Sequence, residues 1–111
     1  MDDAIPPLMA LPKIVEVIDG KIPIFLDCGV ETGMDVYKAL ALGATAVSVG
    51  RAMMRSLSDS GAQGVTAKVD EMTATLAGTM ARTAISTLKE MDSSVVWRPT
   101  TYEPYQQQKM R

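Results

Sequence analysis

The spacing of apolar residues predicts an amphipathic helix near the N-terminus, over residues 7–18. Its apolar positions recur at helical spacing and would form a single stripe: Leu8, Leu11, Ile14, Val15 and Ile18. Pro6 and Pro7 suit a helix start, because the first turn has no acceptor for a backbone N–H. Asp19-Gly20 suits its end. Pro12 predicts either a later start near that residue or a distorted first turn.

Two short apolar runs predict buried strands. Residues 22–26 (IPIFL) and 44–49 (ATAVSV) lack polar alternation, which is typical of parallel strands covered on both faces. Between them we expect a loop over 27–33 and a helix over 34–42, ended by Gly43. Strand, glycine loop, helix and strand form a βαβ unit, so the two strands should be parallel.

The second half of the chain predicts further helices and then a tail. A long amphipathic helix is expected over 63–82, and a shorter one over 85–91. The apolar positions of the long helix are Val65, Val69, Met72, Leu76 and Met80. From residue 92 the composition changes to Ser, Pro, Thr, Tyr and Gln, so residues 93–111 are predicted to be an irregular tail. Its aromatic residues, Trp97, Tyr102 and Tyr105, would pin it to another surface.

Two strands are too few to complete a sheet of this kind. The apolar residues of both strands predict burial on two faces. A two-stranded parallel sheet would leave apolar, unpaired edges that favour association. The fold class is therefore predicted as α/β, a section of a larger parallel sheet or barrel that is incomplete on its own. Residues 1–92 would form this section.

Composition excludes several function classes. The 111 residues carry a formal charge of -2 with scattered Lys and Arg, which argues against nucleic-acid binding. No apolar run is long enough to span a bilayer, and Asp2-Asp3 is unlike a secretory signal, so we expect a cytoplasmic protein. One Cys and no His exclude a disulfide framework, a Cys-cluster zinc site and Ser-His-Asp chemistry within the chain. No metal site is predicted.

The candidate chemistry lies in the loops after the two strands, where α/β folds bind ligands. Gly29 and Gly33 would let backbone N–H groups face an anion before a helix N-terminus, and Gly50-Arg51 would add another N–H and a guanidinium. The spacing matches neither GxGxxG nor a Walker loop. Purely structural roles also fit: a tight turn for the glycines, a surface cation for Arg51, a turn former or cap for Asp27, and a small buried side chain for Cys28.

These segments resemble a known family. Residues 22–30 (IPIFLDCGV), 33–36 (GMDV) and 38–44 (KALALGA) are similar to the late-barrel block of FMN-dependent α-hydroxy-acid oxidases and dehydrogenases. Residues 46–51 (AVSVGR) resemble the family's last strand, and residues 76–92 its closing helices. The likeness covers residues 7–92. A near relative of the KALALGA block also occurs in inosine monophosphate dehydrogenase-like barrels, and the closing helices favour the first family.

The resemblance implies a (β/α)8 TIM barrel, of which this chain would supply the last two parallel strands with flanking helices. It also implies FMN as cofactor. The family's phosphate-binding positions map onto Asp27, Cys28, Gly29, Glu31, Gly50 and Arg51. One departure matters: the family usually has Arg where Glu31 stands. Either Glu31 points away from the phosphate, or the site is weakened by an anion.

The family's catalytic His and its substrate-carboxylate Arg belong to an Asn-His-Gly-Gly-Arg stretch upstream of the part matched here, and this chain contains neither. We therefore expect no turnover by this polypeptide alone. The implied partners are the remainder of the barrel, a small 2-hydroxy acid and further copies in a homo-oligomer. Alternatives are a segment of type 2 isopentenyl-diphosphate isomerase or an inosine monophosphate dehydrogenase-like enzyme, and a non-catalytic partial barrel that self-associates.

Overall fold

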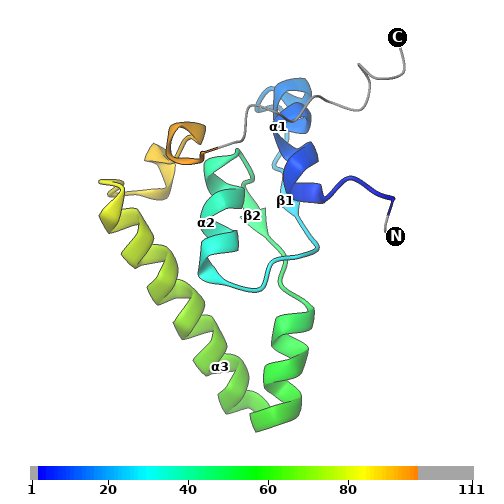
Figure 1. The fold of residues 1–111 in the computed structure, drawn as a ribbon, viewed down its shortest axis with the longest axis vertical. Helices are drawn as coiled ribbons and strands as arrows, with labels where there is room; N and C mark the ends of the chain where they lie inside the picture. Colours follow the sequence, from blue (N-terminus) through cyan, green and yellow to red (C-terminus); the bar gives the residue numbers. More distant parts are fainter. Residues whose placement is uncertain (1–2, 98–111) are drawn as a thin grey trace.

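The computed structural model describes residues 3–97 of the chain (Figure 1). Three helices, two short strands and two 3-10 turns follow one another along this part of the chain. In chain order they are α1 (Pro7–Ile18), β1 (Phe25–Leu26), α2 (Gly33–Ala41), β2 (Ala46–Val47), α3 (Arg51–Arg82), η1 (Leu88–Glu90) and η2 (Ser93–Val95).

Helix α1 has the bounds predicted from its apolar stripe. It begins at Pro7 with Pro12 in its interior, so the later start is wrong, and Asp19 closes it in a left-handed conformation with φ of 50°. Leu11 is only 2% exposed and belongs to the core. Ile14 is 46% exposed, so it does not share the buried stripe.

The strands are parallel, as the βαβ pattern predicts, but they are shorter than expected. Phe25 pairs with Ala46 and Leu26 with Val47 in a two-stranded sheet. Leu26 is buried whereas Phe25 is 69% exposed, so the expectation of burial on both faces is wrong within the described residues. The reason is that each strand has a single neighbouring strand there, and nothing covers the outer side of Phe25.

Helix α2 connects the two strands and packs on both the sheet and α3. Thr32 caps its start, and Gly43, with φ of 106°, follows its end as expected. Tyr37 is buried, and its hydroxyl donates a hydrogen bond of 2.8 Å to Oγ1 of Thr83 at the end of α3. This bond ties the crossover helix to the long helix across 46 positions of sequence.

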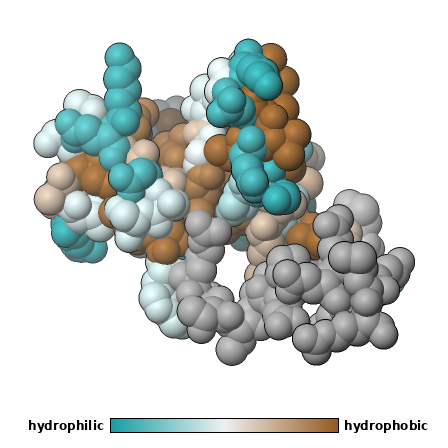
Figure 2. All heavy atoms as spheres, turned by 90° about the horizontal axis from the view of Figure 1, so that it is seen from above, coloured by the Kyte–Doolittle hydropathy of each residue, from teal (hydrophilic) through white to brown (hydrophobic). Residues whose placement is uncertain are grey.

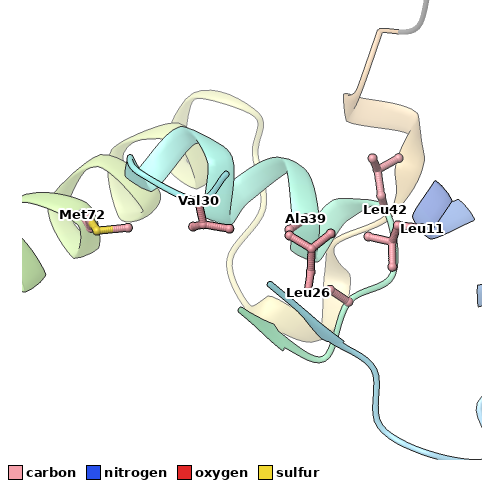
Figure 3. Close-up of a cluster of buried hydrophobic side chains, with 7 residues drawn as sticks. Leu11, Leu26, Val30, Ala39, Leu42 and Met72 are labelled. Atoms are coloured by element: carbon pink, nitrogen blue, oxygen red, sulfur yellow. The ribbon is translucent and has the colours of Figure 1, made fainter. Parts of the chain in front are cut away.

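The core lies where α1, β1, α2 and α3 meet, with α2 running through its middle (Figure 3). Its buried side chains are Leu11, Leu26, Val30, Ala39, Leu42, Ala44 and Met72. Ala39 is 0% exposed, and its small side chain lets α2 approach the sheet closely. The core therefore holds the end of β1 against α2, which positions the loop between them.

Helix α3 differs most from the sequence-based expectation. It runs from Arg51 to Arg82 and bends at Ser60 and Gly61 into two arms (Figure 1). The second arm agrees with the helix predicted over 63–82, whereas the first arm was not predicted. Gly61 has φ of 61° and ψ of -150°, a conformation that essentially only glycine adopts. The first arm was missed because it buries little: Met54 is 71% and Leu57 is 55% exposed. The predicted loop at Gly50-Arg51 is thus a helix N-terminus.

The C-terminal part departs from the predicted helix over 85–91. Ala84, just after α3, adopts a left-handed conformation with φ of 58°. Within residues 85–91 the chain therefore forms the short turn η1 in place of a helix. Val96, just after η2, packs against the core. Trp97 is 85% exposed, and Tyr102 and Tyr105 lie outside the described residues. The boundary at residue 92 stays a prediction.

Large apolar side chains remain exposed around α1 and β1, and hydrophobic groups lie among hydrophilic ones on the face drawn in Figure 2. The exposed large apolar residues of α1, β1 and the segments next to them are Ile5, Met9, Ile14, Val17, Ile22 and Phe25. Contiguous exposed apolar surface usually marks a contact with another surface. Among the described helices, none is both long and apolar enough to cross a bilayer.

Candidate functional site

The chain turns sharply directly after β1. Cys28 and Gly29 are both left-handed, with φ of 72° and 76°. Glycine adopts this conformation at little cost, whereas a residue with a side chain is strained there. Cys28 is exposed, so the expectation of a buried thiol is wrong. The turn directs the backbone of this loop along the carboxyl end of the sheet.

The chain after β2 enters α3 almost at once. Gly50 is the N-cap of α3 and makes no side-chain capping bond, and the first intrahelical bond runs from Met54 N–H to the Gly50 carbonyl. The N–H groups of the first helical turn therefore have no helical acceptor, and they carry the positive end of the helix dipole. Arg51 is exposed at this end and adds a full positive charge.

Because β1 and β2 are parallel, both loops emerge at the same edge of the sheet and enclose a cavity. Its volume is about 240 Å³. The lining residues are Asp27, Cys28, Gly29, Val30, Glu31, Ser48, Gly50 and Arg51. The structure thus brings together the six positions that the resemblance assigns to the phosphate site, and adds Val30 and Ser48. Gly33 is not among the lining residues, since it is buried against α3. Whether they bind the cofactor stays a prediction.

The donor set of this cavity suits a phosphate group. It combines the Arg51 guanidinium with backbone N–H groups at a helix N-terminus, both of which bind phosphate oxygens well. A Cβ added at Gly29 or Gly50 would meet no atom of the chain within 4 Å. Packing within the described chain thus leaves room for a side chain at Gly50. Because glycine has no side chain, the backbone at this position is open to a ligand. The residues present therefore fit the phosphate of FMN.

Glu31 lines the cavity but is not a lone anion there. Its Oε2 lies 3.0 Å from Nη2 of Arg55, on the second turn of α3. The expectation was that Glu31 either faces the phosphate unfavourably or points away. The structure shows a third arrangement, in which Glu31 stays at the cavity and is ion-paired. Arg55 was not a predicted site residue, and nothing in the local sequence links it to Glu31.

Asp35 is a second residue that sequence reasoning missed. Its Oδ2 accepts hydrogen bonds from the backbone N–H groups of Thr32 at 2.9 Å and Glu31 at 3.1 Å. Thr32 Oγ1 accepts in turn from Asp35 N–H, which completes a capping box. Asp35 therefore fixes the backbone that presents Glu31 to the cavity. The Thr-x-x-Asp spacing was the signal that could have found it.

The hydrogen bonds also change the acidity of Asp35. Burial alone raises its pKa, but the bonds from Glu31 and Thr32, helped by nearby Lys38, outweigh burial and lower the pKa below its ordinary 3.8. A lowered pKa in the folded state means that ionised Asp35 stabilises the fold above pH 3.8, and that this stabilisation is lost as pH falls through the folded pKa.

Asp35→Asn should lower the free energy of unfolding by about 1 kcal/mol at pH 7, because the charge-assisted cap is weakened. It should also flatten the loss of stability below pH 4 relative to the unsubstituted chain. Urea unfolding followed by circular dichroism at a series of pH values measures both effects. Asp70→Asn, at an exposed position of α3, is the matched control. An unchanged acid slope in Asp35→Asn would contradict the assignment.

Among residues 3–97 no group of three or more His, Cys, Asp and Glu side chains is arranged to hold a metal ion.

Comparison with known proteins decides the family. The model of the family described as FMN-dependent dehydrogenase matches residues 1–98. The chain belongs to this family. The match bears out the resemblance seen in the glycine loops, favours it over the alternative barrel families, and confirms FMN as the expected cofactor by the family's own description.

Curated relatives in the family are oxidases. The chain is 44% identical over 87 residues to glycolate oxidase of Spinacia oleracea, covering 78% of this chain and 24% of that enzyme. It is 54% identical over 65 residues to L-lactate oxidase of Lysinibacillus sphaericus (strain C3-41), covering 59% of this chain and 17% of the oxidase. The chain thus spans about a quarter or less of the length of these relatives.

Solved structures in the family share the fold of this segment. A mandelate oxidase with a monooxide FMN adduct superposes with a TM-score of 0.79 at 31% identity, over 84% of this chain and 30% of the oxidase chain. An (S)-mandelate dehydrogenase mutant gives 0.76 at 33% identity, over 83% of this chain and 26% of its own. The arrangement of two parallel strands and flanking helices is therefore that of a segment of FMN-dependent oxidases.

Proposed function

We propose that this chain supplies the FMN phosphate site of an FMN-dependent α-hydroxy-acid oxidase or dehydrogenase. One observation carries the proposal: the loops after β1 and β2 enclose one cavity, lined by the Arg51 guanidinium and the open backbone of Gly29 and Gly50. The backbone N–H groups and Arg51 would hold the phosphate. Bound FMN supplies the electron acceptor for oxidation of a small 2-hydroxy acid.

In this proposal the chain is the C-terminal section of a (β/α)8 barrel, with residues 1–92 in the barrel and 93–111 as a tail. Three features support it: the chain matches only about a quarter of its relatives' length, its sheet has two strands, and Phe25 and Ile22 beside the sheet are exposed. In a closed barrel both strands would gain neighbours and the exposed apolar groups would be covered. The remainder of the barrel is thus the first partner.

The proposed division of labour follows from composition. The chain has no histidine, so it holds no imidazole to take the proton of the substrate hydroxyl. The base and the substrate-carboxylate Arg would come from the remainder of the barrel. We expect no oxidation of lactate or glycolate by the 111-residue chain with FMN alone. Turnover by the isolated chain would contradict this division.

Titration of the isotope-labelled full chain with FMN, riboflavin and inorganic phosphate, followed by amide NMR, tests the phosphate site. We expect FMN and phosphate to shift the backbone amides of Gly29, Gly50 and Arg51, and riboflavin, which lacks the phosphate, to shift them little. The amide of Gly78, on the far arm of α3, is the internal control. Equal effects of FMN and riboflavin at Gly50 would sink the proposal.

A second candidate function is a non-catalytic partial barrel that self-associates into a homo-oligomer. The unpaired strand edges of the described sheet and the 69% exposure of Phe25 favour it. Light scattering separates the two candidates when combined with the titration. A stable oligomer without phosphate-dependent shifts supports self-association alone, whereas a monomer with those shifts supports the FMN phosphate site.

A further inference from the structure

The ion pair between Glu31 and Arg55 lies at the rim of the cavity. Glu31 is a lining residue, and its carboxylate meets the Arg55 guanidinium at 3.0 Å. The Glu31 side chain is 48% exposed and that of Arg55 is 62% exposed. An isolated pair this exposed contributes little to fold stability. Its position beside the cavity points instead to a role in binding.

Both members of the pair belong to the elements that form the site, the loop after β1 and the first arm of α3. The Glu31 backbone N–H is bonded to Asp35, which fixes the direction in which its side chain leaves the loop. Arg55 follows Arg51 by four residues on the first arm of α3, so the two guanidinium groups lie on one helix face, one turn apart. Glu31 thus lines the cavity and contacts Arg55, which is not itself among the lining residues.

The charges of the cavity explain what the pair does. The lining contains two carboxylates, Asp27 and Glu31, but a single guanidinium, Arg51. A phosphate dianion entering this space would be repelled by an unpaired Glu31. Arg55 brings the formal charge of these four side chains to zero, which leaves the α3 N-terminus as the net attraction for a phosphate.

We infer that Arg55 is a positioning residue for binding of a phosphorylated ligand, acting through Glu31. Its guanidinium draws the Glu31 carboxylate to the rim and neutralises it, so that the cavity accepts a phosphate despite an acidic residue in its lining. The inference rests on the proposed function and adds to it a residue outside the predicted site. If Arg55 acts in this way, the preference of the chain for FMN over riboflavin depends on the Glu31–Arg55 ion pair.

Arg55→Ala in the full chain tests the inference, with the ratio of riboflavin to FMN dissociation constants as the readout. The two ligands share the ring and the sugar-alcohol chain and differ in the phosphate, so a general loss of structure would not change the ratio selectively. We expect the ratio to fall about fivefold, because Glu31 is left unpaired near the phosphate. Glu31→Gln should keep the ratio or raise it.

The double variant distinguishes action through Glu31 from a direct contact. With Glu31→Gln in place, Arg55→Ala should change the ratio by less than about twofold, because no carboxylate remains to be neutralised. Lys68→Ala is the matched control, since Lys68 forms a similar ion pair with Glu71 at 3.1 Å on the far arm of α3. It should leave the ratio unchanged.

Two outcomes would overturn the inference: no change of the ratio in Arg55→Ala, or the same loss in the presence and absence of Glu31→Gln. Failure of the proposed function has a different signature. In that case the unsubstituted chain shows no preference for FMN over riboflavin, and Arg51→Ala changes nothing. A preserved preference that Arg51→Ala abolishes and Arg55→Ala leaves intact would sink the inference alone.

Discussion

Gly33→Ala is expected to lower the free energy of unfolding by about 3 kcal/mol, more than any other single substitution proposed for this chain. Gly33 is the first residue of α2 and is buried where this helix meets α3. A Cβ at this position would collide with the backbone carbonyl oxygen of Met72 and lie 2.7 Å from Cβ of Thr75. Since the colliding atom belongs to helix backbone, relief requires the two helices to move apart.

Urea unfolding of the full chain, followed by circular dichroism, measures the effect. Gly78→Ala is the matched control, because Gly78 lies in α3, the helix against which Gly33 packs, and a Cβ there meets nothing within 4 Å. Alanine is the better helix former, so this control should stabilise the chain by about 0.5–1 kcal/mol. If both substitutions changed stability by similar amounts in the same direction, close packing of α2 on α3 would be wrong.

Arg51→Ala is expected to weaken FMN binding by about 30-fold while leaving stability nearly unchanged. The guanidinium can form two charge-assisted hydrogen bonds to phosphate oxygens. At an exposed site, where water competes for both groups, the two bonds together contribute about 2 kcal/mol, which corresponds to about 30-fold in affinity. Arg51 is exposed at the start of α3, so removal of its side chain costs the fold little. Riboflavin binding should be almost unaffected, because riboflavin carries no phosphate.

Fluorescence or NMR titration with both ligands measures this difference. Arg51→Lys keeps the charge but loses the planar fork, so an intermediate loss of about fivefold is expected. Arg82→Ala is the control, since Arg82 is an exposed cation at the opposite end of α3. Equal loss of FMN and riboflavin binding in Arg51→Ala would show that Arg51 supports the loop and does not contact the phosphate.

Sequence reasoning succeeded where local chemistry and tertiary structure agree. The bounds of α1 match the prediction because its apolar spacing, its N-terminal prolines and Asp19-Gly20 all act within the helix. Helix α2 follows within one residue of its predicted bounds because a glycine loop precedes it and Gly43 ends it. The parallel pairing of the strands was predictable because a crossover helix leaves little other choice.

Reasoning from local sequence failed where burial depends on neighbours. The first arm of α3 has a weak apolar pattern, and its start is supported by Ala52 and Met53 packing near the core. Phe25 belongs to an apolar run that predicts burial, yet it is exposed because nothing in the described chain covers it. The segment over 85–91 has helical residues, but the left-handed Ala84 redirects the chain.

Part of the candidate site was also predictable from the sequence, and part of it was not. The two loops were predicted to share a site because the carboxyl ends of parallel strands meet at one edge of the sheet, and the family resemblance named the individual positions in them. The Glu31–Arg55 pair was not predicted, because its members are 24 positions apart and meet only once α3 begins directly after β2. An ion pair depends on distance in space, which spacing along the chain does not provide.

By itself, then, the sequence determined the order of the elements and their parallel pairing, and its resemblance to a family pointed to the loops that line the candidate site. Only the tertiary structure decided that Gly50-Arg51 begins a helix, that Asp35 fixes the Glu31 loop, and that Glu31 is neutralised by Arg55. The physical reason is that caps, turns and apolar periodicity act within a few residues. Burial and charge balance, in contrast, are properties of groups brought together by packing.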